Sequence, residues 1–566
     1  MGRGAERVRV VEGLRILTLE GSGYQMGRRH GEALREEIEQ GVLPFFGNHT
    51  EFDSRLRGLP EADRRALAAQ LDREVFDRLR RFVPQDYLDE LRGIAEGSDL
   101  PEDVALRGNF LSELLQITVK QQVPSQGAEA GCTGFAVSGP ATRGGELLHG
   151  KNTDYRGGGV WDRFPVLILS RPAGGFAYLR ATSAGLIKCN TCMNERGVTL
   201  GGHFLFSTDA VADGVGFTVL ENEVMRRAAS LGEAISIVEE GPRAGAFAFI
   251  VSDAKSGEAV ALECTRSGVS ERRLSDGVVF MSNVCTASEA QKRCDILLRA
   301  SVARNPLSRW RRIGELIAKH HGRIDLDAAL CFLGDHLDEA SGRERGAAHT
   351  IAGIGNVTSA LLRPERREIW VGVGPVPAAN NPYLGFGCRA ALEGRGEIEF
   401  LGRRPGNPFV RDDRLRALRR YAEAACLYDH SPDSRDPILK LLHEAREIDP
   451  QEPAYPRMIA RFHLLAGDPD PAEAMLRRAL AIPAQGPSEV AEAWLLLGYA
   501  RDLRHAREEA KDAYRRALES NEAGAEPIRA VNTLVLLSAH RHLQEAFRPG
   551  DIEALNVSFA LASGWE

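Results

Sequence analysis

The sequence has few of the features that define several protein classes. Its nine cysteines in 566 residues are too few for a disulfide framework. No apolar run approaches the ~18 residues that a membrane span needs. The net charge of −7 leaves no basic footprint for nucleic acid. The basic start of the chain is not followed by the apolar segment of a secretory signal. We therefore expect a cytoplasmic protein with reduced thiols and with neither a membrane nor a nucleic-acid partner.

What the sequence does contain is typical of a large globular protein. Apolar residues make up 43% and charged residues 27% of the chain, and a chain of this length is expected to form more than one domain. Its patterns change twice. Residues 1–131 are mostly of helical type, 132–400 alternate between strand and helix patterns, and 401–566 are rich in Ala, Leu, Arg and Glu at helical spacing. We expect a leader, a central α+β domain and a C-terminal all-α domain with these boundaries.

A predicted β-hairpin lies at the start of the central domain. The alternating run Gly131-Cys132-Thr133-Gly134-Phe135-Ala136-Val137 is followed by a turn rich in Gly and Pro, and a second run covers Leu147–Tyr155. Cys132 begins the first strand, and Lys151, Asn152 and Asp154 end the second. Because these two ends are neighbours in a hairpin, a thiol, a carboxylate and an amide are expected to meet at one edge of a sheet.

Cys132 has two interpretations. A buried structural cysteine at a strand start is the common one, because cysteine is among the most buried residue types. In the other, the chain is cut between Gly131 and Cys132, and the new α-amine acts as the general base for the thiol of the same residue. Such an amine has a reference pKa of about 7.7–8.0, which suits that role. Gly131 suits the cut because it tolerates a strained backbone.

A family resemblance favours the second interpretation. From about Leu14 to about Phe386 the chain resembles the penicillin acyltransferase (acyl-coenzyme A:6-aminopenicillanate acyltransferase) family of N-terminal-nucleophile hydrolases, which is related to the choloylglycine hydrolases. The stretches that carry the resemblance are Gly131-Cys132-Thr133, Gly150-Lys151-Asn152-Thr153-Asp154-Tyr155, Gly23 to Gly27 with His30-Gly31, Met193 to Val198, Asp253 with Gly257 and Glu263, Ser282-Asn283 with Ser288 and Arg293, and Trp370 to Pro375. Their order and spacing together are specific.

The resemblance implies a fold and an activity. The fold would be the four-layer αββα sandwich, with the leader retained as a small subunit after self-cleavage at Gly131–Cys132. The activity would be hydrolysis or transfer of a small acyl amide or acyl thioester through an acyl-cysteine. No metal or organic cofactor is implied.

The resemblance also assigns roles to individual residues. Asp154 and Arg293 would orient the α-amine, and Asn283 and a donor near Gly202 and His203 would stabilise the oxyanion. The further candidates are Asn152 as a catalytic-site residue and Lys151, Tyr155 and Gly202 as substrate-binding residues. The chain departs from its relatives at three places, because His203 stands near the position of an asparagine, Ser282 replaces threonine, and Val284 replaces histidine.

Further patterns predict the rest of the central domain. The runs Leu186–Cys192 and Thr350–Ile354 read as strands, and Glu221–Glu240 and Glu289–His321 read as helices. Cys189 and Cys192 form a C-x-x-C without the second pair of a zinc site, and in an alternating strand they would point to opposite faces. Glu263 is interpreted as structural.

The C-terminal region shows degenerate repeats. Trp494-Leu495-Leu496-Leu497-Gly498 with Ala510, Tyr514 and Ala517 resembles the tetratricopeptide consensus, and Ala445 and Ala479 are one such repeat apart. We expect two or three repeats and a capping helix over 528–543. They would form a groove for a protein partner, or a helical cap that packs on the catalytic domain or mediates dimerisation.

Two other functions remain open from the sequence. The chain could be a scaffold whose working part is the helical repeat and whose hydrolase fold is inactive. It could also be an unprocessed cysteine hydrolase with a distant histidine base.

Overall fold

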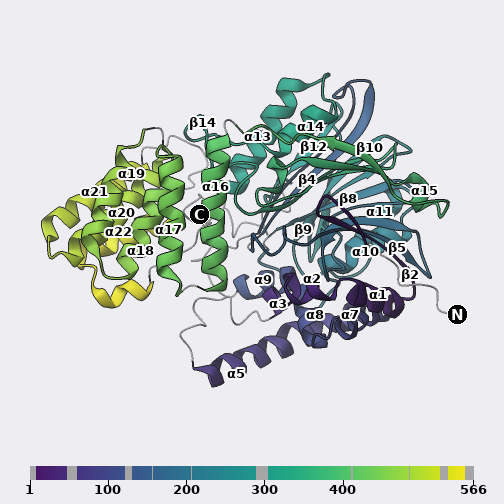
Figure 1. The fold of residues 1–566 in the computed structure, drawn as a ribbon, viewed down its shortest axis with the longest axis horizontal. Coiled ribbons are helices and arrows are strands. Elements are labelled where there is room, and N and C mark those ends of the chain that lie inside the picture. The colour runs from purple at the N-terminus through teal and green to yellow at the C-terminus, as the bar shows by residue number, and fades with distance from the viewer. Residues whose placement is uncertain are drawn as a thin grey trace.

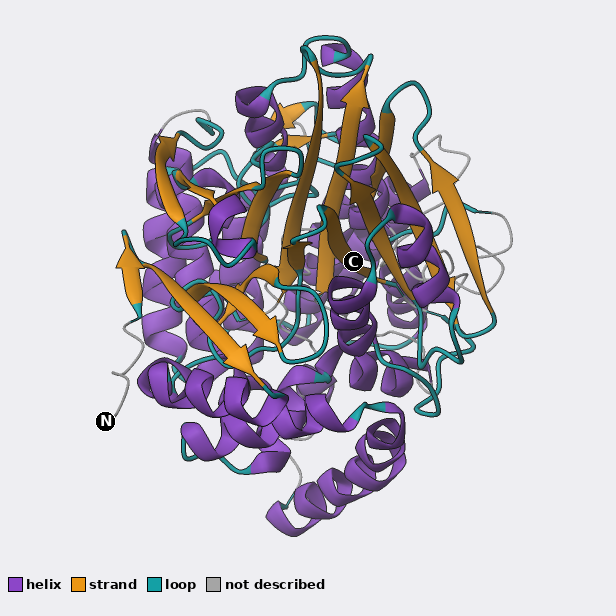
Figure 2. Cartoon of the chain, turned by 90° about the vertical axis from the view of Figure 1, so that its right-hand side faces the viewer, coloured by secondary structure: helices purple, strands orange, loops and turns teal. Residues whose placement is uncertain are grey.

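The computed structural model describes residues 8–47, 60–120, 130–155, 157–205, 207–287, 304–409, 412–431, 433–483, 485–522 and 533–554. Two large β-sheets face each other, and helices cover the outer face of each (Figures 1 and 2). This arrangement confirms the α+β class and the αββα layering expected from the family resemblance.

One sheet has seven strands and carries the predicted hairpin. In order across the sheet these are β12 (Val278–Met281), β3 (Ala130–Gly139), β4 (Gly145–Tyr155), β15 (Asn356–Arg363), β16 (Glu368–Gly372), β17 (Tyr383–Gly387) and β18 (Glu399–Arg404). Helices α13 (Arg304–His320) and α14 (Leu326–Leu333) cover its outer face. Phe135, Leu148, Ile313 and Leu330 form part of the apolar cluster between them.

The other sheet has nine strands. In order these are β1 (Arg9–Val11), β2 (Leu14–Gly21), β5 (Pro165–Pro172), β6 (Tyr178–Ser183), β7 (Thr191–Asn194), β8 (Val198–Phe204), β9 (Phe247–Asp253), β10 (Glu258–Thr265) and β11 (Gly268–Arg273). Helices α10 (Phe217–Arg227) and α11 (Leu231–Glu239) lie on its outer face. Apolar side chains, among them Ala136, Ala248 and Ile250, fill part of the space between the sheets.

The leader contributes to the nine-stranded sheet as well as to a helical layer. Its β2 pairs in parallel with β5, with Arg15 opposite Val166. Its helical elements are α1 (Gly23–Ala33), α2 (Arg35–Glu39), α3 (Val42–Gly47), α5 (Glu61–Leu71), a π-helical turn Asp72–Phe76, α6 (Asp77–Leu79), a 3₁₀ turn Arg80–Phe82, α7 (Gln85–Gly97), α8 (Glu102–Asn109) and α9 (Leu111–Lys120). Because a strand of the central sheet comes from the leader, the two parts share one fold.

The glycines near the N-terminus permit a close helix contact. Helices α1 and α7 pack so closely that a Cβ on Gly27 would lie 1.9 Å from the carbonyl oxygen of Glu90. A Cβ on Gly23 or Gly31 would also lie under 3.0 Å from the backbone of α7. The Gly-x-x-x-Gly segment therefore explains how these two helices approach each other.

A buried ion cluster joins the leader to the nine-stranded sheet. Glu90 of α7 contacts Arg180 of β6 at 3.2 Å and Arg226 of α10 at 3.3 Å, and Arg226 also contacts Asp86 at 2.6 Å. The side chains of Glu90 and Arg180 are fully buried. Since removing one partner would leave an uncompensated buried charge, the cluster makes loss of the leader unfavourable.

The C-terminal region consists of α16 (Asp412–His430), α17 (Arg435–Ile448), α18 (Ala454–Leu465), α19 (Pro469–Ala481), α20 (Pro487–Leu503), α21 (Arg507–Glu522), α22 (Thr533–Gln544) and a 3₁₀ turn Pro549–Ala554. In Figure 1 these helices lie beside the sandwich, with α16 nearest to it. Arg345, which follows the short hairpin of β13 (Leu337–Asp338) and β14 (Arg343–Glu344), pairs with Glu452 at 2.5 Å and Glu489 at 2.6 Å. The region therefore packs on the catalytic domain, as one of the two expectations had it.

The residues of the repeat pattern pack against one another. Ala510, Tyr514 and Ala517 of α21 are fully buried. A Cβ on Gly498 of α20 would lie 2.1 Å from the Tyr514 ring. Helices α20 and α21 thus meet through Gly498 and Tyr514. The assignment to tetratricopeptide repeats, the groove for a partner and dimerisation stay predictions.

Some predicted elements differ from the structure. Thr350–Ile354 forms no strand, and the strand predicted over Leu186–Cys192 begins only at Thr191. The helix predicted over Glu221–Glu240 is two helices, because Ser230 caps the start of α11 by accepting a hydrogen bond from Glu233 N. The remaining small elements are α15 (Arg389–Leu392) and a 3₁₀ turn Ala378–Asn380.

Candidate active site

The predicted hairpin is present, and its register shows which residue lies opposite Cys132. Cys132 lies opposite Thr153, and Gly131 lies opposite Asp154. The Cys132 side chain is buried, with 5% of its surface exposed. Directly opposite residues share a face of the sheet, and successive residues alternate. Cys132, Thr153 and Lys151 therefore face the other sheet, whereas Thr133, Asn152 and Asp154 face α13 and α14.

The side chain of Asn283 holds the backbone nitrogen of Cys132. Strand β12 ends at Met281, opposite Gly134, so backbone pairing with β3 stops before Cys132. The Asn283 Oδ1 atom then accepts a hydrogen bond from Cys132 N at 2.5 Å. Its Nδ2 atom donates to the Phe204 carbonyl oxygen at 2.7 Å. A side-chain amide thus holds the nitrogen that would become an α-amine after cleavage.

Arg309 of α13 binds the other side of the same residue. Its Nη1 atom donates to the carbonyl oxygen of Cys132 and to Thr133 Oγ1 at 3.0 Å, and its Nη2 atom donates to Asn283 Oδ1 at 3.0 Å. Its Nη1 atom also lies 3.9 Å from a carboxylate oxygen of Asp154. This fully buried arginine therefore links three of the groups expected at the site.

The Asp154 carboxylate is buried and partly unpaired. One oxygen accepts a hydrogen bond from Asn356 Nδ2 at 3.0 Å, and the other has no hydrogen-bond partner among the described residues. Burial raises the pKa of Asp154, and the Arg309 guanidinium and the Asn356 amide oppose that rise. The oxygen without a hydrogen bond, which lies 3.9 Å from Arg309 Nη1, can still accept a hydrogen bond from a cation that forms nearby.

The family resemblance assigns the role of orienting the α-amine to Arg293, which lies outside the described residues. Arg309 was not singled out, although it lies in the predicted helix Glu289–His321. No local signal separates it from its neighbours Arg311 and Arg312, because only the three-dimensional packing of α13 against β3 decides which arginine points inward.

Asn152 does not reach the Cys132 thiol. Its Nδ2 atom donates to the carbonyl oxygens of Leu333 and Ile351, and its Oδ1 atom accepts from Ser359 Oγ. These contacts tie β4 to α14 and to the chain before β15. Asn152 is fully buried in this network on the face covered by helices.

Lys151 lies on the face of the nucleophile. Its ammonium donates to the Asn152 carbonyl oxygen at 2.7 Å and to Thr153 Oγ1 at 3.1 Å. Because Thr153 is the residue opposite Cys132, Lys151 places a buried positive charge close to the thiol.

His203 reaches the hairpin from the opposite sheet. A Cβ on Gly134 would lie 2.7 Å from His203 Nε2, so the imidazole ring occupies the space left by that glycine. His203 Nδ1 lies 3.2 Å from the Gly201 carbonyl oxygen, which can only accept a hydrogen bond. Burial lowers the pKa of His203 well below its usual range, and Lys151 and His149 add to that effect. A neutral ring with its proton on Nδ1 leaves Nε2 as an acceptor.

The backbone amide of Gly202 is already used. Gly202 N donates to the Asn190 carbonyl oxygen at 3.2 Å. A Cβ on Gly202 would collide with Glu221 and Phe217 under α10, which accounts for glycine at this position. Gly202 therefore serves close packing of α10 on β8, on the face of that sheet away from Cys132.

Tyr155 connects the site to the leader. Its hydroxyl lies 3.1 Å from Ser112 Oγ of α9, and Lys188 Nζ donates to the same Ser112 oxygen at 2.8 Å. The Lys188 ammonium also lies 5.5 Å from the centre of the Tyr155 ring. Leader and catalytic chain thus share a polar network that starts beside Asp154.

Two further carboxyl groups lie near this network. Burial raises the pKa of Glu113, and it raises the pKa of Glu221 to about 7, while Lys188 opposes both shifts. Neither carboxyl forms an ion pair with Lys188 within the part of the chain that the structure describes. Sequence patterns gave no signal for Lys188, Glu113 or Glu221, which come together only in the fold.

The remaining candidates have structural surroundings. Glu263 accepts hydrogen bonds from the backbone nitrogens of Thr286 and Ala287 and so fixes the loop after Asn283. Cys189 and Cys192 share one apolar cluster and their thiols interact, so the expectation of opposite faces was wrong. Strand β7 begins only after Asn190, whose φ of 41° lies in the left-handed region, so the alternation of a strand does not extend back to Cys189.

The free cysteines agree in part with the expected reduced thiols. Cysteines 132, 189, 192, 264, 331, 388 and 426 are free, whereas Cys285 is disulfide-bonded. Among the described residues no group of three or more His, Cys, Asp or Glu side chains is placed to hold a metal ion. Within the same ranges no helix is both long and apolar enough to cross a membrane.

One known family matches part of this chain. Residues 141–375 match the family described as acyl-coenzyme A:6-aminopenicillanic acid acyl-transferase. Over this region, which is less than half of the chain, the sequence is similar to that family. The matched region begins just after Cys132 and includes Asp154, Asn283 and Arg309, and it confirms the family that the sequence motifs indicated.

Individual relatives are distant. An uncharacterized protein of Archaeoglobus fulgidus is 26% identical over 257 residues, which cover 43% of this chain and 42% of the relative. Protein dcd1B of Dictyostelium discoideum is 26% identical over 266 residues, which cover 44% of this chain and 50% of the relative. The matched part of the chain thus spans half or less of the length of each relative.

Two solved structures are also similar. A mutant conjugated bile acid hydrolase from Clostridium perfringens has 15% identity and a TM-score of 0.32, covering 48% of this chain and 96% of that one. An N-acylethanolamine-hydrolyzing acid amidase orthologue from Caenorhabditis elegans has 14% identity and a TM-score of 0.30, covering 41% of this chain and 93% of that one.

Proposed function

We propose that this protein is a self-cleaving cysteine N-terminal-nucleophile hydrolase or acyltransferase that acts on acyl amides or acyl thioesters. The match to this family supports the general activity, hydrolysis or transfer of an acyl group. The observation that carries the finer proposal is the hydrogen bond from Cys132 N to Asn283 Oδ1, together with the arginine on the Cys132 carbonyl oxygen. This backbone unit is held by side chains that a structural cysteine would not need.

The first step is cleavage of the Gly131–Cys132 bond. The Cys132 sulfur attacks the Gly131 carbonyl carbon, the carbon–nitrogen bond breaks, and the nitrogen takes a proton. Water then hydrolyses the thioester and releases the carboxylate of Gly131. Cys132 is left with a free thiol and a free α-amine. Asn283 accepts from the new amine, and the Asp154 oxygen without a hydrogen bond stabilises its ammonium form.

The second step is the reaction with substrate. The α-amine takes the thiol proton, and the thiolate attacks the substrate carbonyl carbon. As the carbon–nitrogen bond of the amide breaks, the proton passes to the leaving amine and an acyl-cysteine remains. Water, or an amine acceptor, then removes the acyl group. Lys151 favours the thiolate, and its contact with Thr153 keeps the charge beside Cys132.

His203 has an alternative role in this scheme. Its Nε2 atom is an acceptor, so we propose that it receives a hydrogen bond from the thiol or the amine. The oxyanion role that the family resemblance gives to this position would need a donor there. Gly202 N is engaged with the Asn190 carbonyl oxygen and does not supply that donor.

The proposal is tested by comparing amide turnover in the cleaved wild type with Cys132→Ala and His203→Gln. Release of amine from a panel of N-acyl amides should be lost in Cys132→Ala and retained, at a reduced rate, in His203→Gln. Loss of turnover in His203→Gln with an uncut chain would instead favour the unprocessed cysteine hydrolase with a histidine base. A protein without turnover in any form would favour the scaffold function.

A further inference from the structure

Residues 333–356 link the active site to the C-terminal helices. This bridging segment runs from the end of α14, through the short hairpin of β13 and β14, to the start of β15. Arg414 of α16 donates to the Glu344 carbonyl oxygen of β14 at 2.9 Å, and in Figure 1 these two elements lie where the C-terminal helices meet the sandwich. The segment therefore contacts both parts of the molecule.

Arg345 fixes the middle of the bridging segment to two carboxylates of the C-terminal region. Its guanidinium donates to the two oxygens of Glu489 at 2.6 and 3.0 Å and to the two oxygens of Glu452 at 2.5 and 3.3 Å. All three side chains are buried. Glu452 also accepts a hydrogen bond from Ala347 N at 3.4 Å. Because both carboxylates bind the guanidinium through two atoms, they fix its orientation as well as its position.

This ion cluster supplies geometry more than stability. Charged groups lose their hydration on burial, and apolar side chains of similar volume often stabilise a protein as much or more. Burial would raise the pKa of Glu489, but Arg345 and Arg457 hold that pKa well below its usual range. Glu489 is therefore ionised at neutral pH, and the buried charges permit only one arrangement of the segment around Arg345.

The hairpin of the bridging segment is also tied to α13. Arg345 N donates to the His336 carbonyl oxygen at 2.9 Å, and His336 Nδ1 lies 3.1 Å from the Arg345 carbonyl oxygen. The preceding residue, Asp335, accepts from Nε and Nη2 of Arg312 at 2.8 and 2.9 Å. Since Arg312 is three residues after Arg309, the hairpin packs on the helix that supplies the arginine of the site.

The end of the bridging segment holds Asp154. Asn356 Nδ2 donates to the Asp154 carboxylate at 3.0 Å, and Asn356 Oδ1 accepts from Ala379 N at 2.8 Å. The Gly355 carbonyl oxygen accepts from Tyr155 N at 2.7 Å. Asn356 is fully buried. The position of the segment thus decides where the carboxylate lies.

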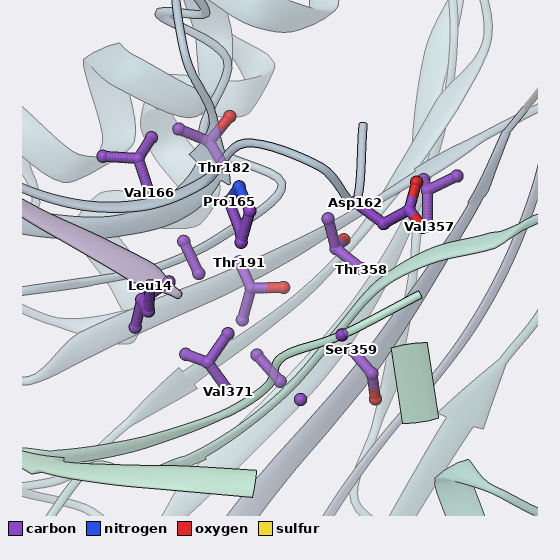
Figure 3. A pocket seen from close by; sticks show the side chains of 14 residues that line it. Leu14, Asp162, Pro165, Val166, Thr182, Thr191, Val357, Thr358, Ser359 and Val371 are labelled. Atoms are coloured by element: carbon purple, nitrogen blue, oxygen red, sulfur yellow. The ribbon is translucent and has the colours of Figure 1, made fainter. Parts of the chain in front are cut away.

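Asn152 connects the segment to β4 at a second place. Its Nδ2 atom donates to the carbonyl oxygens of Leu333 and Ile351, which lie near the two ends of the segment. Its Oδ1 atom accepts from Ser359 Oγ of β15 at 2.7 Å. Figure 3 shows the Ser359 side chain on the other side of β15 from that of Thr358. Strand β4 is therefore held by the segment on the face that carries Asn152.

We propose that the C-terminal helices support the active site. Glu452 and Glu489 are positioning residues, which act through Arg345 and the bridging segment. They hold Asp154 where it stabilises the ammonium form of the Cys132 α-amine. The inference rests on the proposed function. The contacts between the two ends are continuous and buried, and close-packed interiors transmit displacements, so loosening Arg345 displaces Asp154.

The expected signature is a change in the pH profile. A carboxylate near the α-amine raises the pKa of that amine, so displacing Asp154 should move the acidic limb of kcat/KM to lower pH by about one pH unit. Loss of folded protein alone would lower the rate equally at every pH. The variants below leave the other charged or titratable groups of the site unchanged, which are Lys151, Tyr155, Arg309 and His203.

The test compares Glu489→Gln with Glu492→Gln in the full-length protein. Both residues lie on α20 and both are buried, with 6% and 4% of their surface exposed. Among the described residues Glu492 pairs with Arg457 and Arg461, and none of its ion pairs is with the bridging segment. Glu492→Gln is therefore a matched control for the loss of a buried charge.

The measurements are kcat and KM for the N-acyl amide that the wild type turns over fastest, from about pH 5 to about pH 9. Rates are normalised to the fraction of cleaved chain. Glu489→Gln should lower kcat about 10- to 100-fold and move the acidic limb to lower pH. Glu492→Gln should lower the urea midpoint but keep the kcat and pH profile of the wild type. Loss of self-cleavage in Glu489→Gln alone would also support the inference.

Two results would overturn the inference: a wild-type kcat and pH profile in Glu489→Gln, or equal effects of Glu489→Gln and Glu492→Gln. In both cases the wild type still turns over its amide. A wild type that neither cleaves itself nor turns over an amide would contradict the proposed function, so the two failures are distinguishable. If Glu489→Gln does not fold, Arg345→Lys decides the outcome, because it keeps the charge but loses the contacts to both carboxylates. It should change kcat and the acidic limb in the same direction.

Discussion

The amide oxygen of Asn283 accepts a hydrogen bond from the backbone nitrogen of Cys132 at 2.5 Å. Strand β12 ends two residues before Asn283, so a side chain replaces the backbone partner at this position. In the proposed mechanism this nitrogen becomes the general base. The hydrogen bond therefore makes Asn283 an acceptor for the amine. An oxyanion donor at this position would respond differently to substitution.

Replacing Asn283 distinguishes the two roles. Asn283→Asp keeps an acceptor for the amine and for Arg309, so we expect it to retain self-cleavage and most of kcat. Asn283→Ala should lose both. If Asn283 instead donates from Nδ2 to an oxyanion, both variants lose about 10²- to 10³-fold in kcat. The measurement is the fraction of cleaved chain by mass spectrometry, together with kcat and KM for an amide substrate.

We expect self-cleavage to require Arg309. Its guanidinium donates to the Cys132 carbonyl oxygen and to Asn283 Oδ1, and it lies 3.9 Å from an Asp154 carboxylate oxygen. Arg309→Gln leaves Asp154 as a buried carboxylate without its cation, and breaking a buried pair costs about 3–5 kcal/mol. Denaturant unfolding should show a loss of this order, and self-cleavage should stop.

The control is Arg311→Gln on the same helix. The side chain of Arg311 is 30% exposed and pairs with Glu339 instead of with the residues around Cys132. This variant should cleave normally. Normal cleavage in Arg309→Gln would contradict the role given to this arginine.

Glu221 makes stability depend on pH. Burial raises the pKa of Glu221 to about 7 from an ordinary value of 4.5. The folded state therefore favours the protonated form. The stability that the protonated Glu221 contributes is fully present below the unfolded-state pKa of 4.5. It is lost as the pH rises through about 7, and the loss in the free energy of unfolding reaches at most about 3 kcal/mol at pH 8. Glu221→Gln should remove this dependence.

The measurement is urea unfolding of wild type and Glu221→Gln at pH 5 and pH 8. The variant should gain stability over wild type at the higher pH and differ little at the lower one. Glu239→Gln, an exposed residue on the neighbouring helix, should leave the pH dependence unchanged. A parallel pH dependence in wild type and Glu221→Gln would rule out Glu221 as its source.

The leader should stay bound after cleavage. It supplies β2 to the nine-stranded sheet and the Glu90 carboxylate to Arg180 and Arg226. The two fragments should co-elute in size-exclusion chromatography and separate only in denaturant. Glu90→Ala should lower the denaturant midpoint strongly, because it leaves the buried Arg180 without its carboxylate partner and leaves Arg226 with Asp86 alone.

Glu96→Ala is the matched control, because Glu96 lies on α7 as Glu90 does. Glu96 pairs with Arg28 at the surface, and exposed ion pairs contribute little to stability. Fragments of the wild type that separate without denaturant would contradict the shared fold.

Much of the fold could be predicted because its signals are local. The hairpin follows from alternation and turn residues, and the motifs placed Cys132, Asp154 and Asn283 in one site. The side chains of Cys132 and Asp154 lie on opposite faces of the sheet. This depends on the register between β3 and β4, which shifts between Val137 and Gly139. A pattern of alternation does not reveal such a shift.

Other parts depended on tertiary contacts that a sequence pattern does not encode. Arg309 is one arginine among several on an amphipathic helix, and only the packing of α13 selects it. Thr350–Ile354 has the composition of a strand, yet the Ile351 carbonyl oxygen accepts from Asn152 instead of from a neighbouring strand. Asn190 has a left-handed conformation and β7 begins only after it, so the alternation rule does not extend back to Cys189.

The central claim is that Cys132 cuts the chain before itself and becomes the N-terminal nucleophile. An intact-mass spectrum of freshly purified wild type, recorded beside Cys132→Ala, tests it most directly. The account predicts two fragments in wild type that meet between Gly131 and Cys132, and one uncut chain in the variant. A single full-length chain in both samples would contradict the α-amine mechanism.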